Sequence, residues 1–248
     1  MNEKNVLIIG LGEVGKAIKR IEEEAENVVY VIDKMEPDNK PCCVNSFDVM
    51  HICFPYTKEF INDAVDYINQ YPSKIIIVHS TVPAGTTRKI AEGTAEAVRI
   101  VHSFIRGMHP DLVPGILTFT KPVGGDDISV QLAMQHLLLI GIKCRPFKNY
   151  ETSELAKLLS TAYYGYNILF AKQAKKICNE LDLDYEEVYI WSNEDYNQGY
   201  TQLGRPNVVR PVLYPPPEKI GGHCVSRNFE LLPECDLKTF CLEQNNKK

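Results

Sequence analysis

The sequence predicts an α/β fold, in which a doubly wound sheet domain precedes a small, mainly helical domain. In the first 147 residues, short apolar runs alternate with segments whose apolar residues recur at helical spacing. The run at 75–78 is nearly continuous, which is typical of a parallel strand covered by helices on both faces. From residue 148 this alternation stops. We therefore expect a sheet domain at 1–147 and a helical domain at 148–248.

The expected elements of the sheet domain follow in order. Strands are predicted at residues 5–9, 28–32, 48–54, 75–78, 98–102 and 118–123. Helices are predicted at residues 14–25, 57–70, 84–97 and 131–139. Proline at position 55 ends the third strand, and Gly124-Gly125-Asp126 predicts a turn.

The second domain begins with a long apolar stripe at helical spacing. Ser153 is the expected N-cap of a helix that reaches about Leu181. A shorter helix is expected at 184–193. Five prolines between positions 194 and 222 then predict a long loop, which in a compact region is usually functional or mobile.

Composition narrows the function classes. The 248 residues are 44% hydrophobic and 24% charged, with a net charge of −5, as in an ordinary globular protein. Without a Lys/Arg block, nucleic acid and anionic membranes are not expected partners. No apolar run approaches the roughly 18 residues of a membrane span, and a strand begins too early for a signal peptide.

Eight cysteines show neither the spacing of a disulfide framework nor a CxxC or HExxH pair. We therefore expect reduced thiols, a cytoplasmic location and no zinc site.

A glycine-rich turn gives the strongest functional signal. The run at 5–9 leads into Gly10-Leu-Gly12-Glu-Val-Gly15, and the next run ends in Asp33. Strand, GxGxxG, helix and an acid about 20 residues later form the Rossmann-type dinucleotide pattern. The helix N-terminus favours phosphates, while the acid accepts ribose hydroxyls and favours NAD over NADP. The other residues of this unit that we expect to contact the cofactor are Leu11, Glu13, Val14 and Lys34. The positive charge of Lys34 weakens the preference for NAD over NADP.

Two further strand ends meet the same edge of the predicted sheet. Phe54 and Pro55 follow one strand, and Ser80 and Thr81 follow the next. Ligands of open α/β sheets bind at this edge. We expect Phe54 to pack near the cofactor and the hydroxyls to contact its nicotinamide end; a turn role for Thr81 is the alternative.

Candidate catalytic groups lie in the second half of the sequence. Glu154, Lys157 and Thr161 fall on one stripe of the long helix, away from its apolar face. They face a cleft, where an ammonium could stabilise an alkoxide, or they face solvent as an ordinary Glu–Lys pair. Cys224 follows two glycines that expose its thiol; an inert turn cysteine is the alternative.

These segments together resemble the nucleotide-sugar dehydrogenases of the UDP-glucose/GDP-mannose type. The matching strings are Val6 to Gly15, Asp48 to Pro55, Ser80-Thr-Val-Pro-Ala-Gly-Thr-Thr87, Glu154-x-x-Lys157 and Gly221-Gly-His-Cys224. The resemblance implies two successive NAD-dependent oxidations of a primary alcohol. It makes Cys224 the thiol that holds the aldehyde, Lys157 the group that stabilises the alkoxide, and Thr81 a contact of cofactor or substrate.

The sequence departs from that family at three points. Thr161 stands where the family carries asparagine, and Asn228 stands where it carries aspartate. Asparagine cannot act as a carboxylate base, so the second oxidation, which ends in hydrolysis, lacks the base that the family uses. The resemblance also implies that the family's third, sugar-nucleotide-binding domain is missing.

A second resemblance is to the β-hydroxyacid dehydrogenases. Its matching strings are Ser103-Phe-Ile-Arg-Gly107, Gly115-Ile-Leu-Thr118 and Val123-Gly-Gly-Asp126. Here Arg106 and His109 would bind a carboxylate or phosphate, Lys157 would be the catalytic lysine, and Cys224 would be structural. A surface loop is the alternative for Arg106 and His109.

Three functional hypotheses follow. The first is an NAD-dependent alcohol dehydrogenase related to the nucleotide-sugar enzymes, forming a homodimer through its helical half. The second is a β-hydroxyacid-type enzyme that oxidises a small anionic substrate once. The third is a catalytically silent NAD-binding or partner-binding module, which the residues Thr161 and Asn228 favour.

Overall fold

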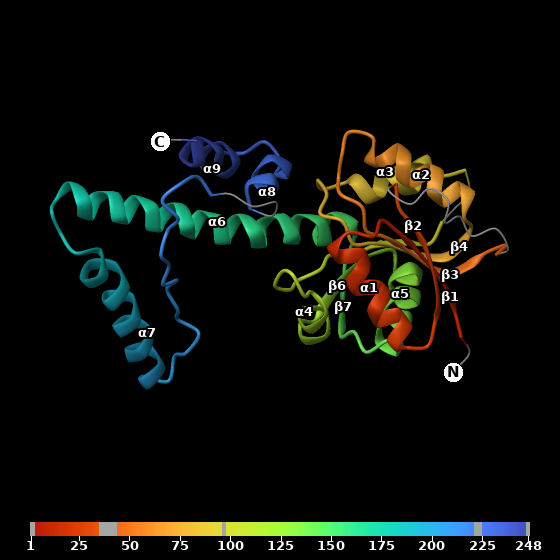
Figure 1. Cartoon of the computed structure of the whole chain (residues 1–248), viewed down its shortest axis with the longest axis horizontal. Coiled ribbons are helices and arrows are strands. Elements are labelled where there is room, and N and C mark those ends of the chain that lie inside the picture. Colours follow the sequence, from red (N-terminus) through yellow and green to blue (C-terminus); the bar gives the residue numbers. More distant parts are fainter. Residues whose placement is uncertain (1–2, 35–43, 96–97, 221–224, 247–248) are drawn as a thin grey trace. The chain divides into compact units, whose positions relative to one another are not determined.

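The computed structural model describes residues 3–34, 44–95, 98–220 and 225–246. The chain forms two compact units, Met1–Lys157 and Leu158–Lys248. The first unit contains a seven-stranded sheet in the order β2-β1-β3-β4-β5-β6-β7 (Figure 1). Its strands are β1 (Asn5–Ile9), β2 (Val28–Ile32), β3 (Phe47–Ile52), β4 (Ser73–Val78), β5 (Ile100–His102), β6 (Lys121–Gly125) and β7 (Cys144–Phe147).

Neighbouring strands of the sheet run parallel, except that β6 is antiparallel to β5. Strand order reverses between β1 and β3, because β2 lies on one side of β1 and β3 on the other. The predicted doubly wound sheet is therefore confirmed. A reversal of this kind opens a crevice beyond the carboxyl ends of the strands.

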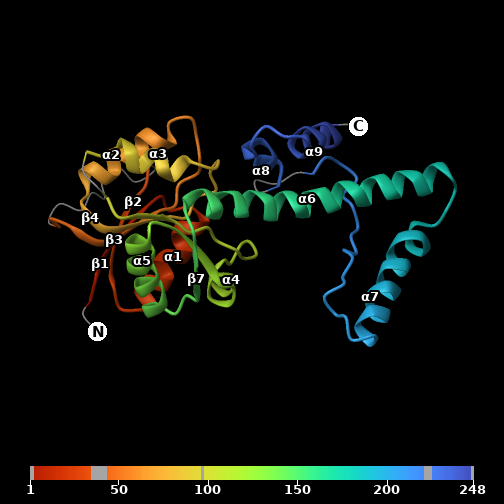
Figure 2. The ribbon, with the colours of Figure 1, turned by 180° about the vertical axis from the view of Figure 1, so that it is seen from behind.

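Helices cover both faces of the sheet (Figures 1 and 2). On one face lie α1 (Glu13–Glu24) and α5 (Asp127–Leu139), whose Ile18 and Leu137 are fully buried. On the other lie α2 (Phe60–Gln70) and α3 (Thr86–Gly93), with buried Phe60 and Ile90. The short α4 (Val113–Thr118) precedes β6. Burial of these apolar side chains, at about 25 cal/mol per Å², drives formation of this unit.

Two expectations for the sheet unit are wrong near its end. The strand expected at 118–123 begins only at Lys121, after α4, and Gly124 and Gly125 continue it instead of turning. A Cβ atom at Gly124 would lie 2.3 Å from the carbonyl oxygen of Asn149. Glycine is therefore required at position 124 by close approach of two backbones, which a turn-based interpretation does not detect.

The long helix α6 (Tyr150–Glu180) begins three residues before the expected cap. Asn149 caps it instead, because its Oδ1 accepts a hydrogen bond from the Thr152 amide at 2.9 Å. Ser153 is buried inside the first turns, where its hydroxyl lies 2.9 Å from His102 Nδ1. The prediction of Ser153 as N-cap is therefore wrong.

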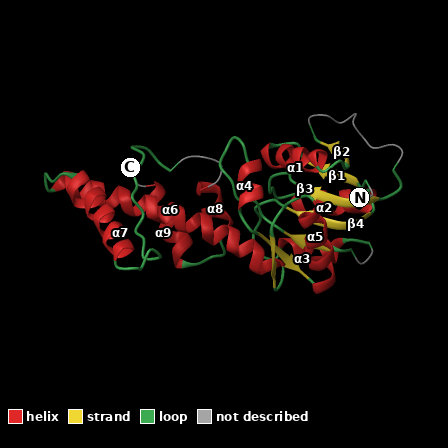
Figure 3. Cartoon of the chain, turned by 90° about the horizontal axis from the view of Figure 1, so that it is seen from below, coloured by secondary structure: helices red, strands yellow, loops and turns green. Residues whose placement is uncertain are grey.

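The second unit contains helices and loops, with no strand among its described residues (Figure 3). Residues of α6 from Leu158 onward pack against α8 (Val225–Leu231) and α9 (Asp236–Asn246) through buried Leu169, Phe229 and Cys241. A π-helix (Glu186–Trp191) leads directly into α7 (Ser192–Gln202), so the loop predicted from residue 194 starts only after Gln202. Because α7 has no buried residue, it has no apolar stripe from which to predict it.

The described segment after α7 is held by side chains of the helices. Tyr185 and Tyr189 donate hydrogen bonds to the carbonyl oxygens of Leu213 and Pro211, at 2.8 and 2.9 Å. Non-proline residues of the segment are held through their N–H groups as well, since the Arg210 amide donates to Asn197 Oδ1 at 2.8 Å. None of the described helices combines the length and apolar character needed to cross a membrane.

Candidate functional site

A cavity of about 390 Å³ opens at the carboxyl ends of β1, β2 and β3. Its volume lies within the range of about 300–1,000 Å³ that is usual for small-molecule sites. It is located where the strand order reverses, the position at which doubly wound sheets bind ligands. Residues from all three strand ends line it, among them Gly10, Gly12, Asp33, Lys34, Phe54 and Pro55.

The three glycines of the turn at this cavity differ in the room they leave for a side chain. Gly10 has φ +94°, and a Cβ atom there would lie 2.8 Å from the Phe54 amide nitrogen. A Cβ atom at Gly15 would lie 1.9 Å from the Gly10 carbonyl oxygen. At Gly12, by contrast, no protein atom lies within 4 Å of the Cβ position. Thus Gly10 and Gly15 allow the turn and the packing of α1, and Gly12 leaves open space at the N-terminus of α1.

Asp33 connects the glycine turn to the end of β2. Its Oδ2 accepts a hydrogen bond from the Leu11 amide at 2.6 Å, and both residues line the cavity. A carboxylate here can accept hydrogen bonds from a ribose and repel a 2′-phosphate. Lys34 Nζ lies 2.9 Å from Asp63 Oδ2, so its charge is paired with a carboxylate of α2.

Ser80 and Thr81 follow β4 as expected. The Ser80 hydroxyl donates to the Phe54 carbonyl oxygen at 2.6 Å, and Ser80 is buried. It therefore positions the strand end that carries Phe54 and Pro55. Thr81 is half-buried. Contact of either hydroxyl with a cofactor stays a prediction.

Glu154 lies in the interior of the first unit and not on a solvent-facing stripe. It is fully buried, and its two carboxylate oxygens accept hydrogen bonds from the Gly85 and Thr87 amides at 2.6 and 2.7 Å. Burial raises the pKa of this carboxyl group, although the two N–H bonds oppose the rise. Glu154 thus caps the N-terminus of α3, which links the string 80–87 to the string Glu154-x-x-Lys157.

Cationic side chains gather around Phe104, just beyond β5. Lys157 Nζ donates to the Ile105 carbonyl oxygen at 3.0 Å and lies 5.7 Å from the centre of the Phe104 ring. The guanidinium carbon of Arg106 lies 4.9 Å from the same ring. The predicted Lys157 and Arg106 are therefore brought together. Two cations at one aromatic ring, beyond the carboxyl end of β5, favour an anionic ligand.

His109 lies elsewhere on the same loop. It forms an ion pair with Glu13 in the first turn of α1. This contact joins the loop after β5 to the glycine-turn end of α1, and it occupies a side chain that we predict as a substrate contact.

Sequence reasoning missed a second lysine of this region. Lys121 is buried, and its Nζ donates to the carbonyl oxygens of Ser103 and Phe104 at 2.5 and 2.8 Å. Burial lowers its pKa to about 7. The one available signal is a lysine directly before the apolar and glycine-rich strand 122–125.

This pKa makes the free energy of unfolding rise with pH. Between about pH 7 and the unfolded-state value of 10.5, folded Lys121 releases a proton that the unfolded chain keeps. We expect the free energy of unfolding of the wild type to rise over this range relative to that of Lys121→Met, which lacks the titrating group. Urea unfolding of both proteins at pH 7 and pH 9.5 measures it; a pH-independent difference contradicts the lowered pKa.

Two predicted residues belong to the second unit. Thr161 is half-buried on α6, and Asn228 is buried on α8. Cys224, with Gly221, Gly222 and His223, lies outside the described residues. The roles of these residues stay predictions.

No protein-family model matches the chain. The UDP-N-acetyl-D-mannosamine dehydrogenase of Methanococcus vannielii is 23% identical over 172 residues, which cover 69% of this chain and 37% of that protein. The sequence relatives of this chain are nucleotide-sugar dehydrogenases. The predicted resemblance is confirmed. The chain spans between 33% and 48% of the length of the curated relatives that it matches.

Solved structures share the fold. UDP-D-ManNAc dehydrogenase from Pyrococcus horikoshii has a TM-score of 0.77 at 18% identity, covering 97% of this chain and 68% of that one. Mycobacterium tuberculosis 3-hydroxyisobutyrate dehydrogenase has a TM-score of 0.72 at 16% identity, covering 98% and 92%. Both likenesses of fold extend over nearly the whole chain, whereas the sequence strings that resemble the β-hydroxyacid dehydrogenases lie between residues 103 and 126.

Proposed function

We propose that this chain is an NAD-dependent dehydrogenase that oxidises an alcohol group of a nucleotide-sugar-like substrate. The cavity at β1, β2 and β3 carries the proposal, since it combines open space at Gly12, the N-terminus of α1 and the Asp33 carboxylate. These are the features that hold a pyrophosphate and a ribose. The sequence relatives support the same chemistry. Bound NAD supplies the hydride acceptor.

Groups beyond β5 act on the substrate. The Lys157 ammonium is held by the Ile105 carbonyl oxygen, and it would stabilise the alkoxide that forms as the carbinol gives its proton to a water molecule. Glu154 acts one turn earlier as a positioning residue, because its bonds to α3 fix the start of α6. Arg106 binds an anionic part of the substrate, for which a bidentate guanidinium suits phosphate or carboxylate.

Titration of the protein with NADH, followed by the nicotinamide fluorescence, tests cofactor binding. We expect saturable binding, and tighter binding of NADH than of NADPH because Asp33 repels the 2′-phosphate. No response at millimolar NADH contradicts the proposal. NADH binding without turnover across nucleotide sugars and hydroxy acids favours the catalytically silent module instead.

By its resemblance to the family, we propose that Cys224 adds through its sulfur to the aldehyde carbon formed in the first oxidation. The thiohemiacetal would then lose a hydride to a second NAD and a proton to solvent, which gives a thioester, and water would hydrolyse this thioester to the carboxylic acid and the free Cys224 thiol. We expect Cys224→Ser to abolish acid formation and to keep NADH-dependent aldehyde reduction, both measured by product chromatography. Unchanged acid formation removes Cys224 from the mechanism.

The second candidate is a β-hydroxyacid-type enzyme that oxidises a small anionic substrate once. The pair of cations over Phe104 favours it, as does a matched structure that the chain covers to 92%. In that enzyme Cys224 is structural. Alkylation of Cys224 without loss of turnover on hydroxy acids distinguishes it from the first candidate.

We also propose that the protein is a cytoplasmic homodimer. Large apolar side chains remain exposed on α6, among them Tyr163 (64%) and Phe170 (58%), which suits a partner surface. The five described cysteines are free, as expected for a reducing compartment. A monomeric mass from light scattering at micromolar concentration contradicts the dimer.

A further inference from the structure

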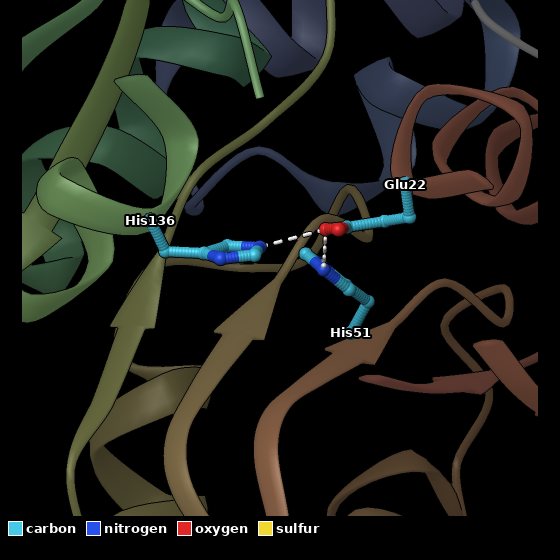
Figure 4. A group of neighbouring side chains, drawn as sticks. All are labelled: Glu22, His51 and His136. Carbon is cyan, nitrogen blue, oxygen red and sulfur yellow. Dashed lines mark hydrogen bonds and ion pairs between the residues drawn. The ribbon is translucent and has the colours of Figure 1, made fainter. Parts of the chain in front are cut away.

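Three polar side chains interrupt the apolar face of the sheet beneath α1 and α5 (Figure 4). Glu22 comes from α1, His51 from β3 and His136 from α5, and they are 0%, 0% and 2% exposed. Glu22 Oε1 lies 2.9 Å from His51 Nε2 and 2.7 Å from His136 Nε2. One potential ligand atom of each residue lies within 4.8 Å of the other two. We call these three residues the buried triad.

A second layer of hydrogen bonds fixes the triad. His51 Nδ1 lies 2.8 Å from His79 Nε2, and His79 Nδ1 lies 2.8 Å from the Ser103 carbonyl oxygen. Asn27 Nδ2 donates to Glu22 Oε2 at 2.7 Å. Side chains that ligate metals have outer partners of this kind, which set the ring tautomer and orient the carboxylate.

The number of protons in this series of hydrogen bonds bears on the protonation of His51. Three hydrogen-bond contacts connect the Ser103 carbonyl oxygen, His79, His51 and the Glu22 carboxylate in that order. Each contact needs one proton. Two neutral imidazole rings carry only two protons. The carbonyl oxygen cannot donate, so with neutral rings both Nδ1 atoms carry the protons. In this arrangement His51 Nε2 turns a lone pair toward the Glu22 carboxylate, which leaves room in the proton count for a third proton or for a metal ion between the two atoms.

We propose that the buried triad is a binding site for a divalent metal ion of the zinc class. Two imidazole nitrogens and one carboxylate oxygen form a ligand set that zinc accepts. At metal–ligand distances of about 2.0–2.2 Å, tetrahedral ligands lie roughly 3.4 Å apart, so the two contacts must open by about half an ångström. The metal joins α1, β3 and α5 on one face of the sheet.

Lys4 competes with the metal. Its Nζ lies 3.2 Å from His136 Nδ1, and because an ammonium only donates, His136 keeps its proton on Nε2, facing Glu22. Ligation through Nε2 moves this proton to Nδ1 and requires the half-buried Lys4 side chain to turn away. Replacement of Lys4 by glutamine removes the competing donor and supplies an acceptor for the Nδ1 proton.

Titration of chelator-treated full-length protein with Co²⁺ tests the site, since its visible absorption reports the ligands. We expect one equivalent to bind with nitrogen and oxygen ligation, without the thiolate charge-transfer band that cysteines give, and Zn²⁺ to displace it. Lys4→Gln is expected to bind Co²⁺ more tightly because the competing donor is gone, by roughly the 10- to 100-fold by which a change of an outer partner alters metal affinity. His51→Gln and His136→Gln are expected to weaken binding by more than that.

His109→Gln is the matched control, since it removes an exposed imidazole outside the triad, and its Co²⁺ affinity is expected to equal that of the wild type. Equal affinities in the wild type and His136→Gln overturn the proposal, as does thiolate ligation in the wild type. If the histidine variants fail to fold, Lys4→Gln decides, because an affinity unchanged from the wild type also overturns it. NADH binding plays no part in this test, so its outcome is independent of the proposed dehydrogenase.

Discussion

Replacement of Gly12 by valine is expected to leave the protein folded and to remove NADH binding. Apart from the residues adjacent in sequence, no atom lies within 4 Å of the Cβ position, and the φ of −69° suits any L-residue. The cost to folding is therefore about 1 kcal/mol, from the poorer N-cap. A valine side chain at the mouth of α1 keeps a pyrophosphate away from the backbone N–H groups. Each lost charge-assisted hydrogen bond weakens binding by about 1.5–3 kcal/mol, roughly 10- to 150-fold.

Gly15→Ala is the matched control for this experiment. Its Cβ would lie 1.9 Å from a backbone oxygen, so we expect it to destabilise the fold of the turn itself. Urea unfolding and NADH fluorescence, measured on both variants, separate the two effects. A Gly12→Val protein that binds NADH as tightly as the wild type contradicts our placement of the pyrophosphate.

Glu22→Leu is expected to lower the free energy of unfolding by about 3–5 kcal/mol, the usual loss when one partner of a buried charged contact is removed. The Glu22 carboxylate contacts His51, His136 and Asn27, and leucine gives none of them an acceptor. Each buried donor left unpaired keeps its desolvation cost. Urea unfolding in the presence of chelator measures the change without a contribution from bound metal.

The neighbouring Glu23→Gln is the control, since it breaks only an exposed pair with Lys19 on the same helix, which contributes about 0.2–1 kcal/mol. If Glu22→Leu costs no more than Glu23→Gln, the triad is not a stabilising contact of the core.

The fold was predictable wherever the signal is local. Continuous apolar runs predicted the parallel strands, and the spacing of Gly10, Gly12 and Gly15 predicted the glycine turn between β1 and α1, of which Gly10 and Gly12 line the cavity. Strand β7 was missed because Pro146 argues against a strand, although an edge position tolerates it. Gly124 was misinterpreted because glycine is favoured both in a turn and where two backbones approach closely, and the sequence does not distinguish the two.

Residues that depend on tertiary contacts could not be predicted in the same way. Glu22 and His136 are 114 positions apart, and no spacing rule connects them. Glu154 was expected on an open stripe, but its neighbours on α3 lie 67 and 69 positions earlier and bury it. Helical periodicity reports which residues share a face of one helix, and it does not report what another segment places against that face.

The reversed direction of β6 has a consequence for engineering this protein. Because β6 is antiparallel to β5, the chain leaves the sheet after His102 and re-enters at Lys121 along the same edge. Residues 106–120 thus form an insertion whose two ends meet the sheet at the same edge, and its Leu112, Val113 and Ile116 are buried in the core that α1 and α5 share. A replacement of this segment by one of another length must therefore keep those three apolar side chains, or it opens the core of the sheet unit.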